Sequence, residues 1–207
     1  MDNAEYQREA LNQAAFEMLN LCTSQLEKAI EAFVSHDSDL SEEVIHRENR
    51  VNAMDIKIEK DCEKFLALFT PVAIDLRFIM AILKINSELE RIGDHAFNIA
   101  SYVVEEDNPI PSGLLEAVEF EKMFNTTKTM MENITVAFDE TDVKIARKVF
   151  KKDKILDKIN IRSFKVLDAE IQKDPTIVKE ALFLFSVIKK MERVGDLIKN
   201  IGEEIIF

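Results

Sequence analysis

The chain has 207 residues, of which 47% are hydrophobic and 32% are charged, and its formal net charge is −12 at pH 7. This size allows one or two domains with a substantial core, and only four Gly and four Pro are typical of a globular, strongly helical protein. The negative charge argues against nucleic acid or anionic lipid as a partner and favours metal cations or basic protein surfaces.

The N-terminus and the cysteines predict a cytoplasmic protein. The segment MDNAEYQREA is polar and acidic, unlike a secretory signal. The sequence contains no run of about 18 apolar residues, the length needed to span a membrane. Cys22 and Cys62 lack metal-type spacing, and two cysteines do not make a disulfide framework. We expect both to be buried thiols of a reduced compartment.

Breaks in the first half of the sequence predict three helices. His36-Asp-Ser-Asp39 interrupts the first amphipathic stretch, and Asp39 with Glu42 forms a capping box for the second helix. Thr70 followed by Pro71 predicts an N-cap with Pro at the first position of the third helix. The predicted helices cover residues 5–35, 40–69 and 71–106.

The second half predicts three more helices. The only clear loop, Asp107-Asn-Pro-Ile-Pro-Ser-Gly113, falls at mid-chain, Thr141 caps the next break, and Asp174-Pro175 repeats the cap-plus-Pro signal. Helices are predicted over 113–138, 142–172 and 175–206, and no segment has the alternation of a strand. We therefore predict an all-α fold of six long helices forming two tandem-repeated three-helix bundles, with domains 1–109 and 110–207.

An internal repeat carries the most specific chemical pattern. Glu90-Arg-Ile-Gly-Asp94 recurs 102 residues later (192 minus 90) as Glu192-Arg-Val-Gly-Asp196, and an Asn follows four residues after each motif. At about 100° per residue, this spacing puts two carboxylates and a carboxamide in one stripe, nearly opposite the apolar face of the helix. The stripe is predicted at the surface, unlike the inward-facing ligands of a ferritin-like di-iron core. Its members are Glu90, Asp94 and Asn98 in the first half and Glu192, Asp196 and Asn200 in the second.

Acidic rows on the preceding helices are expected to complete two metal sites. Each row lies at the edge of its helix's apolar face, so it could meet the stripe on the neighbouring helix. The rows are Glu48, Asn52, Asp55 and Glu59 in the first half, and Asp153 and Asp157 in the second. Such all-oxygen ligands suit Mg²⁺, Ca²⁺ or Mn²⁺, and also iron.

Two matched glycines support a constrained role for the stripe. A glycine within a helix costs about 1 kcal/mol relative to Ala, so Gly93 and Gly195 indicate close backbone approach or a required gap. A single acidic row is usually only a solvated helix face, but an unconstrained face would not keep this motif in register twice.

The segment Pro71-Val-Ala-Ile-Asp75-Leu-Arg77 and the two acidic motifs together resemble the PhoU family of phosphate-signalling proteins over essentially the whole chain. The resemblance implies two three-helix bundles with divalent or trivalent metal clusters on their surface, and it leaves iron, zinc, manganese and magnesium as candidates. The implied sites pair Glu48 and Asn52 with Glu90 and Asp94, and Asp153 and Asp157 with Glu192 and Asp196. Asn52 departs from a fully acidic pair, so we expect the first site to hold fewer ions or to bind them less tightly.

The resemblance also implies a negative regulator of phosphate uptake and phosphate-starvation signalling. Such a protein would link the ATPase of a phosphate ABC transporter to a sensor histidine kinase at the inner face of the membrane, and we expect a homodimer. A metal-dependent phosphohydrolase and a metal-storage bundle remain as alternatives. We do not expect an enzyme, because no positioned base or set of phosphate-clamping Arg and Lys residues is evident in the sequence.

Overall fold

The computed structural model describes residues 3–106 and 108–206. Nearly all of these residues are helical and none of them lies in a strand, which confirms the predicted all-α fold. Asp107, the first residue of the predicted central loop, lies outside the described residues, as do residues 1–2 and 207 at the ends of the two predicted domains.

Six long helices correspond to the six predicted segments. Their bounds are α1 Asn3–Ser35, α2 Ser38–Phe69, α3 Ile74–Glu105, α5 Phe120–Glu140, α7 Val149–Lys173 and α8 Val178–Ile206. Three short elements were not predicted as separate: α4 Ser112–Ala117, α6 Val143–Ala146 and the 3₁₀ turn η1 Pro175–Ile177.

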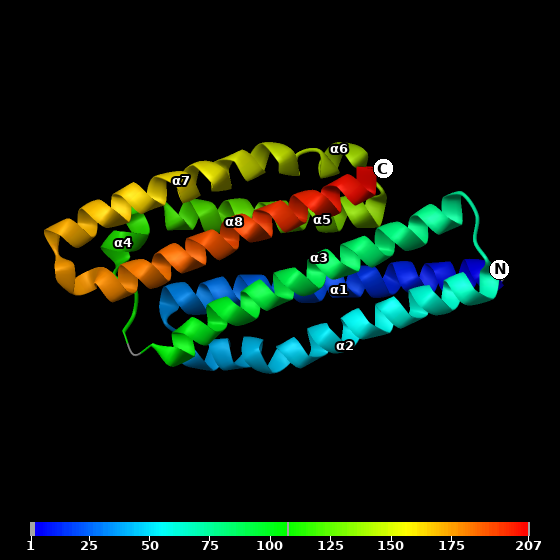
Figure 1. Ribbon diagram of the computed structural model, residues 1–207, viewed down its shortest axis with the longest axis horizontal. Coiled ribbons are helices and arrows are strands. Elements are labelled where there is room, and N and C mark those ends of the chain that lie inside the picture. The colour runs from blue at the N-terminus through cyan, green and yellow to red at the C-terminus, as the bar shows by residue number, and fades with distance from the viewer. Residues whose placement is uncertain (1–2, 107, 207) are drawn as a thin grey trace.

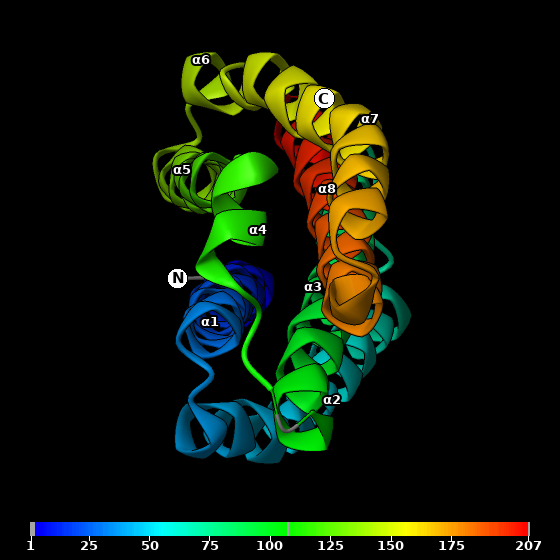
Figure 2. The same ribbon diagram turned by 90° about the vertical axis from the view of Figure 1, so that its left-hand side faces the viewer.

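The long helices form two three-helix bundles, as predicted. Helices α1, α2 and α3 make the first bundle, α5, α7 and α8 make the second, and the two bundles lie side by side (Figure 1). Seen from the end, α3 packs against α8 while α1 lies next to α5 (Figure 2). The two helices that carry the repeated motif therefore meet where the bundles join.

The hydrophobic core lies on the helix faces that the sequence pattern indicates. The apolar stripe opposite the acidic motif is buried in both halves except at its last member, Ile205, which is half-buried. Its buried members are Leu89, Ile92, Ala96, Ile99 and Val103 in α3 and Met191, Val194, Ile198 and Ile201 in α8. Burial of each large aliphatic side chain contributes roughly 1.5–3 kcal/mol. This burial fixes the rotation of α3 and α8, and so the direction in which their carboxylates point.

Two predicted helix starts in the first half are wrong. The N-cap of α2 is Asp37 rather than Asp39, and its carboxylate accepts a hydrogen bond from the backbone N–H of Leu40 at 2.9 Å. Thr70 does not cap α3, because it is left-handed (φ 42°) and ends α2, and α3 begins only at Ile74. The preceding residue avoids the right-handed helical region when Pro follows, so Pro71 terminates α2 instead of starting α3.

Two predicted helices in the second half are interrupted. The segment 113–138 breaks at Glu119, which has a φ of 57°, and the segment 142–172 breaks between α6 and α7. The break at Glu119 allows its neighbours Val118 and Phe120 both to be buried. Asp142, not Thr141, caps α6, whereas the predicted cap at Asp174 is confirmed by its hydrogen bond from the Thr176 N–H at 3.0 Å.

Residues 71–77 comprise the end of the connection between α2 and α3 and the first turn of α3. Asp75, in the first turn of α3, forms an exposed ion pair with Arg8 of α1 at 3.4 Å, and the Arg8 guanidinium lies 4.8 Å from the centre of the Phe78 ring. These contacts hold the start of α3 against α1. Over the described ranges, we find no helix with the length and apolar character needed to cross a membrane.

Candidate metal sites

We call Glu48, Asn52, Glu90 and Asp94 the first-half site, and Asp153, Asp157, Glu192 and Asp196 the second-half site. In both halves a glycine allows the two helices to come close. A Cβ on Gly93 would lie 2.8 Å from Val51 Cγ1 and 3.6 Å from Glu48 Oε2. Of the two predicted reasons for Gly93, the structure shows a gap that the Val51 side chain fills, and this brings α2 and its Glu48 directly against α3.

Glu48 is the most unusual group of the first-half site. Its side chain is 8% exposed, and neither carboxylate oxygen has a partner at hydrogen-bonding geometry among the described residues. Burial first, and then the charges of Asp94 and Glu90, raise its pKa to about 7, although the nearby Asn52 amide favours the charged form. A buried carboxylate beside two others and without a donor is costly, and a bound cation would remove that cost.

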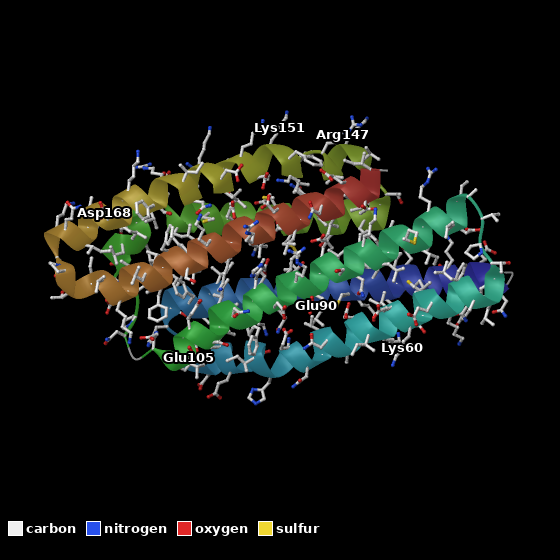
Figure 3. All side chains as sticks on the ribbon, in the orientation of Figure 1. Lys60, Glu90, Glu105, Arg147, Lys151 and Asp168 are labelled. Atoms are coloured by element: carbon white, nitrogen blue, oxygen red, sulfur yellow. The ribbon has the colours of Figure 1, made fainter. Side chains whose placement is uncertain are left out.

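Glu90 extends the same negative field. It lies near the middle of α3 (Figure 3), and burial, followed by the charges of Asp94 and Asp55, raises its pKa. Arg91 opposes this shift, but its guanidinium donates a hydrogen bond to Glu88 at 3.2 Å. The carboxylates of α2 and α3 therefore repel each other where these helices pack together.

Cys22 lies behind these acids in the core. Its thiol donates to the backbone carbonyl of Leu89 at 3.3 Å, and burial, together with the charges of Glu48 and Glu90, raises its pKa well above the usual range. The thiol therefore stays protonated and is not a metal ligand. Cys22 and Cys62 are both free and buried, which confirms the expectation of buried thiols.

Asn98 lies beside the first-half site, one turn after Asp94. Its side chain is exposed, and its amide nitrogen donates to the backbone carbonyl of Asp94 at 2.6 Å. An Asn ligand binds a metal through its amide oxygen, which this bond does not use. The ligand role of Asn98 therefore stays a prediction.

The second-half site repeats the backbone geometry with different electrostatics. A Cβ on Gly195 would lie 2.5 Å from Leu156 Cδ1 and 3.4 Å from Asp153 Oδ1. Asp153 is 5% exposed, and its Oδ2 accepts a hydrogen bond from Lys199 Nζ at 2.8 Å. The same ammonium donates to Asp196 Oδ1, also at 2.8 Å. A lysine therefore bridges the two acids that the sequence predicts to share a metal.

The remaining members of the second half are less closely assembled. Arg193 lies 4.0 Å from Glu192 and 3.8 Å from Asp196. Asp157 is half-buried, and no hydrogen bond or ion pair recorded within the described ranges joins it to the other three acids. Asn200 turns away from the site and donates to Glu88 of α3 at 3.3 Å, at the junction of the bundles.

The donor chemistry of the first-half site fits a hard cation. In the part of the chain that is described, no group of three or more His, Cys, Asp or Glu side chains is arranged to hold a metal ion. A complete protein cage is not required, however, because Mg²⁺ keeps several waters and is bound through one or two carboxylates. Glu48, with Glu90 or Asp94, supplies that number of carboxylates.

Two contributors to the sites were missed by sequence reasoning. Lys199 follows Asp196 by three residues, a spacing at which helical side chains meet, so this part of its role was visible in the sequence. Asn86 donates to the Asp55 carboxylate at 2.7 Å and to the Asp55 backbone carbonyl at 3.1 Å. Nothing in the local pattern points to Asn86, because its contact depends on how α2 and α3 pack.

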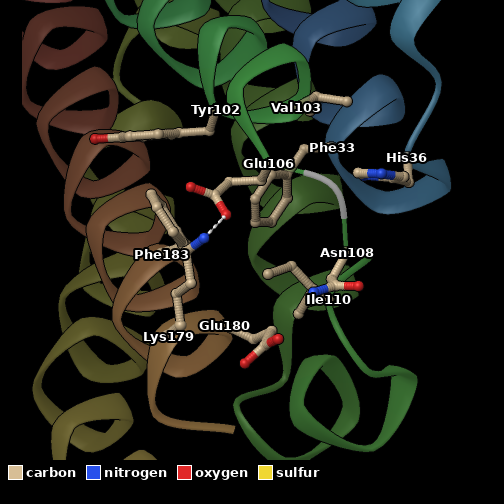
Figure 4. A pocket seen from close by; sticks show the side chains of 10 residues that line it. All are labelled: Phe33, His36, Tyr102, Val103, Glu106, Asn108, Ile110, Lys179, Glu180 and Phe183. Carbon is tan, nitrogen blue, oxygen red and sulfur yellow. Dashed lines mark ion pairs between the residues drawn. The ribbon is translucent and has the colours of Figure 1, made fainter.

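A small cavity at the other end of the junction is not a comparable site. It lies where α1, α3 and α8 meet, has a volume of about 20 Å³, and is spanned by the ion pair between Glu106 and Lys179 (Figure 4). Such a volume accommodates about one water molecule. This cavity is therefore too small to hold a ligand larger than water.

Comparison with known proteins identifies the family. The PhoU domain matches the chain twice, over residues 16–103 and 120–205. The phosphate-specific transport system accessory protein PhoU homolog of Aquifex aeolicus (strain VF5) is 33% identical over 187 residues, covering 89% of this chain and 83% of that protein. The accessory protein PhoU of Escherichia coli (strain K12) is 31% identical over 205 residues, covering 99% and 83%.

Solved structures agree with this assignment. The crystal structure of PhoU from Pseudomonas aeruginosa superposes with a TM-score of 0.91 at 28% identity, covering 98% of this chain and 96% of that one. The phosphate transport system regulatory protein PhoU from Streptococcus pneumoniae gives a TM-score of 0.84 at 26% identity, covering 99% and 95%. The resemblance inferred from the acidic motifs is confirmed: the chain belongs to the PhoU family.

Proposed function

We propose that this chain is an accessory regulatory protein of a phosphate-specific transport system, and that it restrains phosphate uptake genes when phosphate is plentiful. The observation that carries this proposal is the double PhoU domain match over residues 16–103 and 120–205. The relatives named above match nearly all of this chain, and they are named as accessory proteins of such systems. This supports a regulatory role for the chain rather than a catalytic one.

We also propose that the first-half site binds a hard divalent cation. The support is Glu48, which is 8% exposed, lacks a hydrogen-bond partner in the described part of the chain, and faces the charges of Glu90 and Asp94. Binding would offset the repulsion among these carboxylates and would tie α2 to α3. When bound, the ion would supply positive charge at the surface of the first bundle.

This charge offers a route to regulation. The chain is strongly acidic overall, at −12, so filling the first-half site offsets most of the negative charge of one local patch on an otherwise negative exterior. In our proposal the metal-loaded protein, a cytoplasmic homodimer, contacts the ATPase of the phosphate ABC transporter and a sensor histidine kinase. The bound ion then sets how well the protein joins these two partners.

The test is genetic and biochemical. Deletion of the gene should switch on phosphate-starvation genes in high phosphate, and the wild-type chain should restore repression. Affinity purification of the restored protein should recover the transporter ATPase and the kinase. A chain carrying Glu48→Gln and Asp94→Asn should fold but restore repression only in part, whereas Glu63→Gln, at an exposed position of α2, should restore it fully.

Unchanged phosphate-responsive transcription in the deletion strain would contradict the regulatory proposal. In that case a bundle that stores metal would explain the acidic sites better. Full repression by the double variant would retain the regulatory role and remove the bound ion from it.

A further inference from the structure

The two halves differ at one decisive position. Lys199 of α8 corresponds to Phe97 of α3, 102 residues earlier (199 minus 102), and Phe97 has no charge to offer. Three parts of the arrangement recur in both halves: a glycine that admits the neighbouring helix, a buried acid facing it, and an acid one residue after the glycine. The difference therefore concerns how each half balances its negative charge.

In the second half, the balancing cation is part of the chain. Lys199 Nζ lies 2.8 Å from Asp153 Oδ2 and 2.8 Å from Asp196 Oδ1, so one ammonium joins α7 to the acidic motif of α8. Hydrogen bonds between an ammonium and a carboxylate are among the stronger ones in proteins, so Lys199 holds both acids and offsets part of their charge.

In the first half, no such cation reaches the buried acid. Both oxygens of Glu48 are without a hydrogen-bond partner in the described residues. The neighbouring Arg91 donates instead to Glu88. In the second half, by contrast, only Oδ1 of Asp153 lacks such a partner, because Oδ2 accepts from Lys199. The buried acid therefore has a cationic donor in the second half and none in the first.

We infer that Lys199 takes the place of a metal ion in the second half, so that the first half alone recruits a divalent cation. This inference rests on the proposed metal binding of the first-half site. A divalent ion entering the second half would have to displace an ammonium from two hydrogen bonds and overcome its repulsion. Asn52 led us to expect weaker metal binding at the first-half site, whereas Lys199 makes the second-half site the weaker one. The ammonium of Lys199 opposes a metal ion more than the replacement of one carboxylate by the Asn52 amide does.

The experiment counts Mn²⁺ ions bound per chain, from the loss of the free Mn²⁺ signal in electron paramagnetic resonance. The full wild-type chain should bind Mn²⁺ in one half only. Glu48→Gln should abolish that binding, and Asp153→Asn should change its affinity less than twofold. Lys199→Met, which keeps side-chain length and removes the charge, should add a second binding site that Asp153→Asn then removes.

The reciprocal exchange tests the same idea in the first half. Phe97→Lys should weaken Mn²⁺ binding at least tenfold, because it introduces an ammonium where the second half has one. Phe97→Met is the matched neutral control and should bind within twofold of the wild type. Helical circular dichroism and thermal melting establish that each variant folds. If Lys199→Met does not fold, Phe97→Lys still tests the inference.

The outcomes separate this inference from the proposed function. Binding in the wild type that survives Glu48→Gln but falls with Asp153→Asn would overturn the inference and leave a metal-binding protein. A folded Lys199→Met chain that gains no site would also overturn it. Binding seen only after Lys199→Met would support the role of Lys199 and contradict the proposed first-half site, and no binding in any variant would refute both.

Discussion

Replacing Glu48 by Gln should stabilise the metal-free protein at alkaline pH. In the wild type, burial and the charges of Asp94 and Glu90 raise the pKa of Glu48 from 4.5 to about 7. The difference of about 2.5 pH units (7 minus 4.5), at about 1.4 kcal/mol for each unit, bounds the cost of the charged form at about 3–4 kcal/mol. Asp94 is exposed, so solvent screens part of this interaction, and we expect about 2 kcal/mol.

The sign of the effect follows from the direction of the shift. The folded protein holds the proton of Glu48 more tightly than the unfolded chain does, so the favourable contribution is complete below about pH 4.5. It is lost as the pH rises through about 7, where Glu48 becomes charged in the folded state. The difference in unfolding free energy between Glu48→Gln and the wild type should therefore grow from pH 5 to pH 8.

Urea denaturation in the presence of a chelator measures this difference. Each pH requires wild type, Glu48→Gln and the control Glu63→Gln, which changes an exposed carboxylate of the same helix. Comparison with the wild type at the same pH cancels the contributions of all other titrating groups. A Glu48→Gln difference that stays constant from pH 5 to pH 8, or one equal to that of Glu63→Gln, would refute the reasoning.

Three further perturbations have defined expectations. Lys199→Met should destabilise the protein by about 1–3 kcal/mol in urea denaturation, because it leaves Asp153 and Asp196 without their donor; an unchanged midpoint would contradict the bridge. Gly93→Ala should lower the free energy of unfolding by about 1–3 kcal/mol in the same assay, because its Cβ would lie 2.8 Å from the Val51 Cγ1 atom. Val51 is β-branched and has little rotational freedom in a helix, so it cannot easily move aside. A stabilised variant would contradict this and would mean that α2 can shift away from α3. Mn²⁺ at about 100 times its dissociation constant should stabilise the wild type by about 2.7 kcal/mol, and a chelator should reverse the rise in melting temperature; no thermal shift would count against a bound ion.

Breaks in the sequence and hydrophobic periodicity were sufficient to locate the six long helices, although two of the predicted segments are interrupted. Residues opposite the acidic stripe, such as Leu89 and Ile92, are fully buried, because an apolar helix face of this width is removed from water by packing against other helices. The matched glycines, Gly93 and Gly195, also indicated from the sequence alone that neighbouring helices lie close together. These features depend on local spacing, which the sequence contains directly.

Helix ends and charge balance were harder to predict. Asp37 and Asp39 are both good caps, and the choice of Asp37 depends on where the chain turns between α1 and α2. The break at Glu119 follows from the burial of Val118 and Phe120 against other helices, which no local signal contains. The bridge from Lys199 to Asp153 spans 46 residues, so its existence depended on the packing of α7 against α8.

Anomalous diffraction from crystals grown with Mn²⁺, recorded at the manganese absorption edge, tests the central claim most directly. The account predicts one strong peak per chain between α2 and α3, within bonding distance of the Glu48 carboxylate and of Glu90 or Asp94. It also predicts an intact Lys199 bridge and no peak beside Asp153. A peak between Asp153 and Asp196 with Lys199 displaced, or no peak beside Glu48, would contradict it.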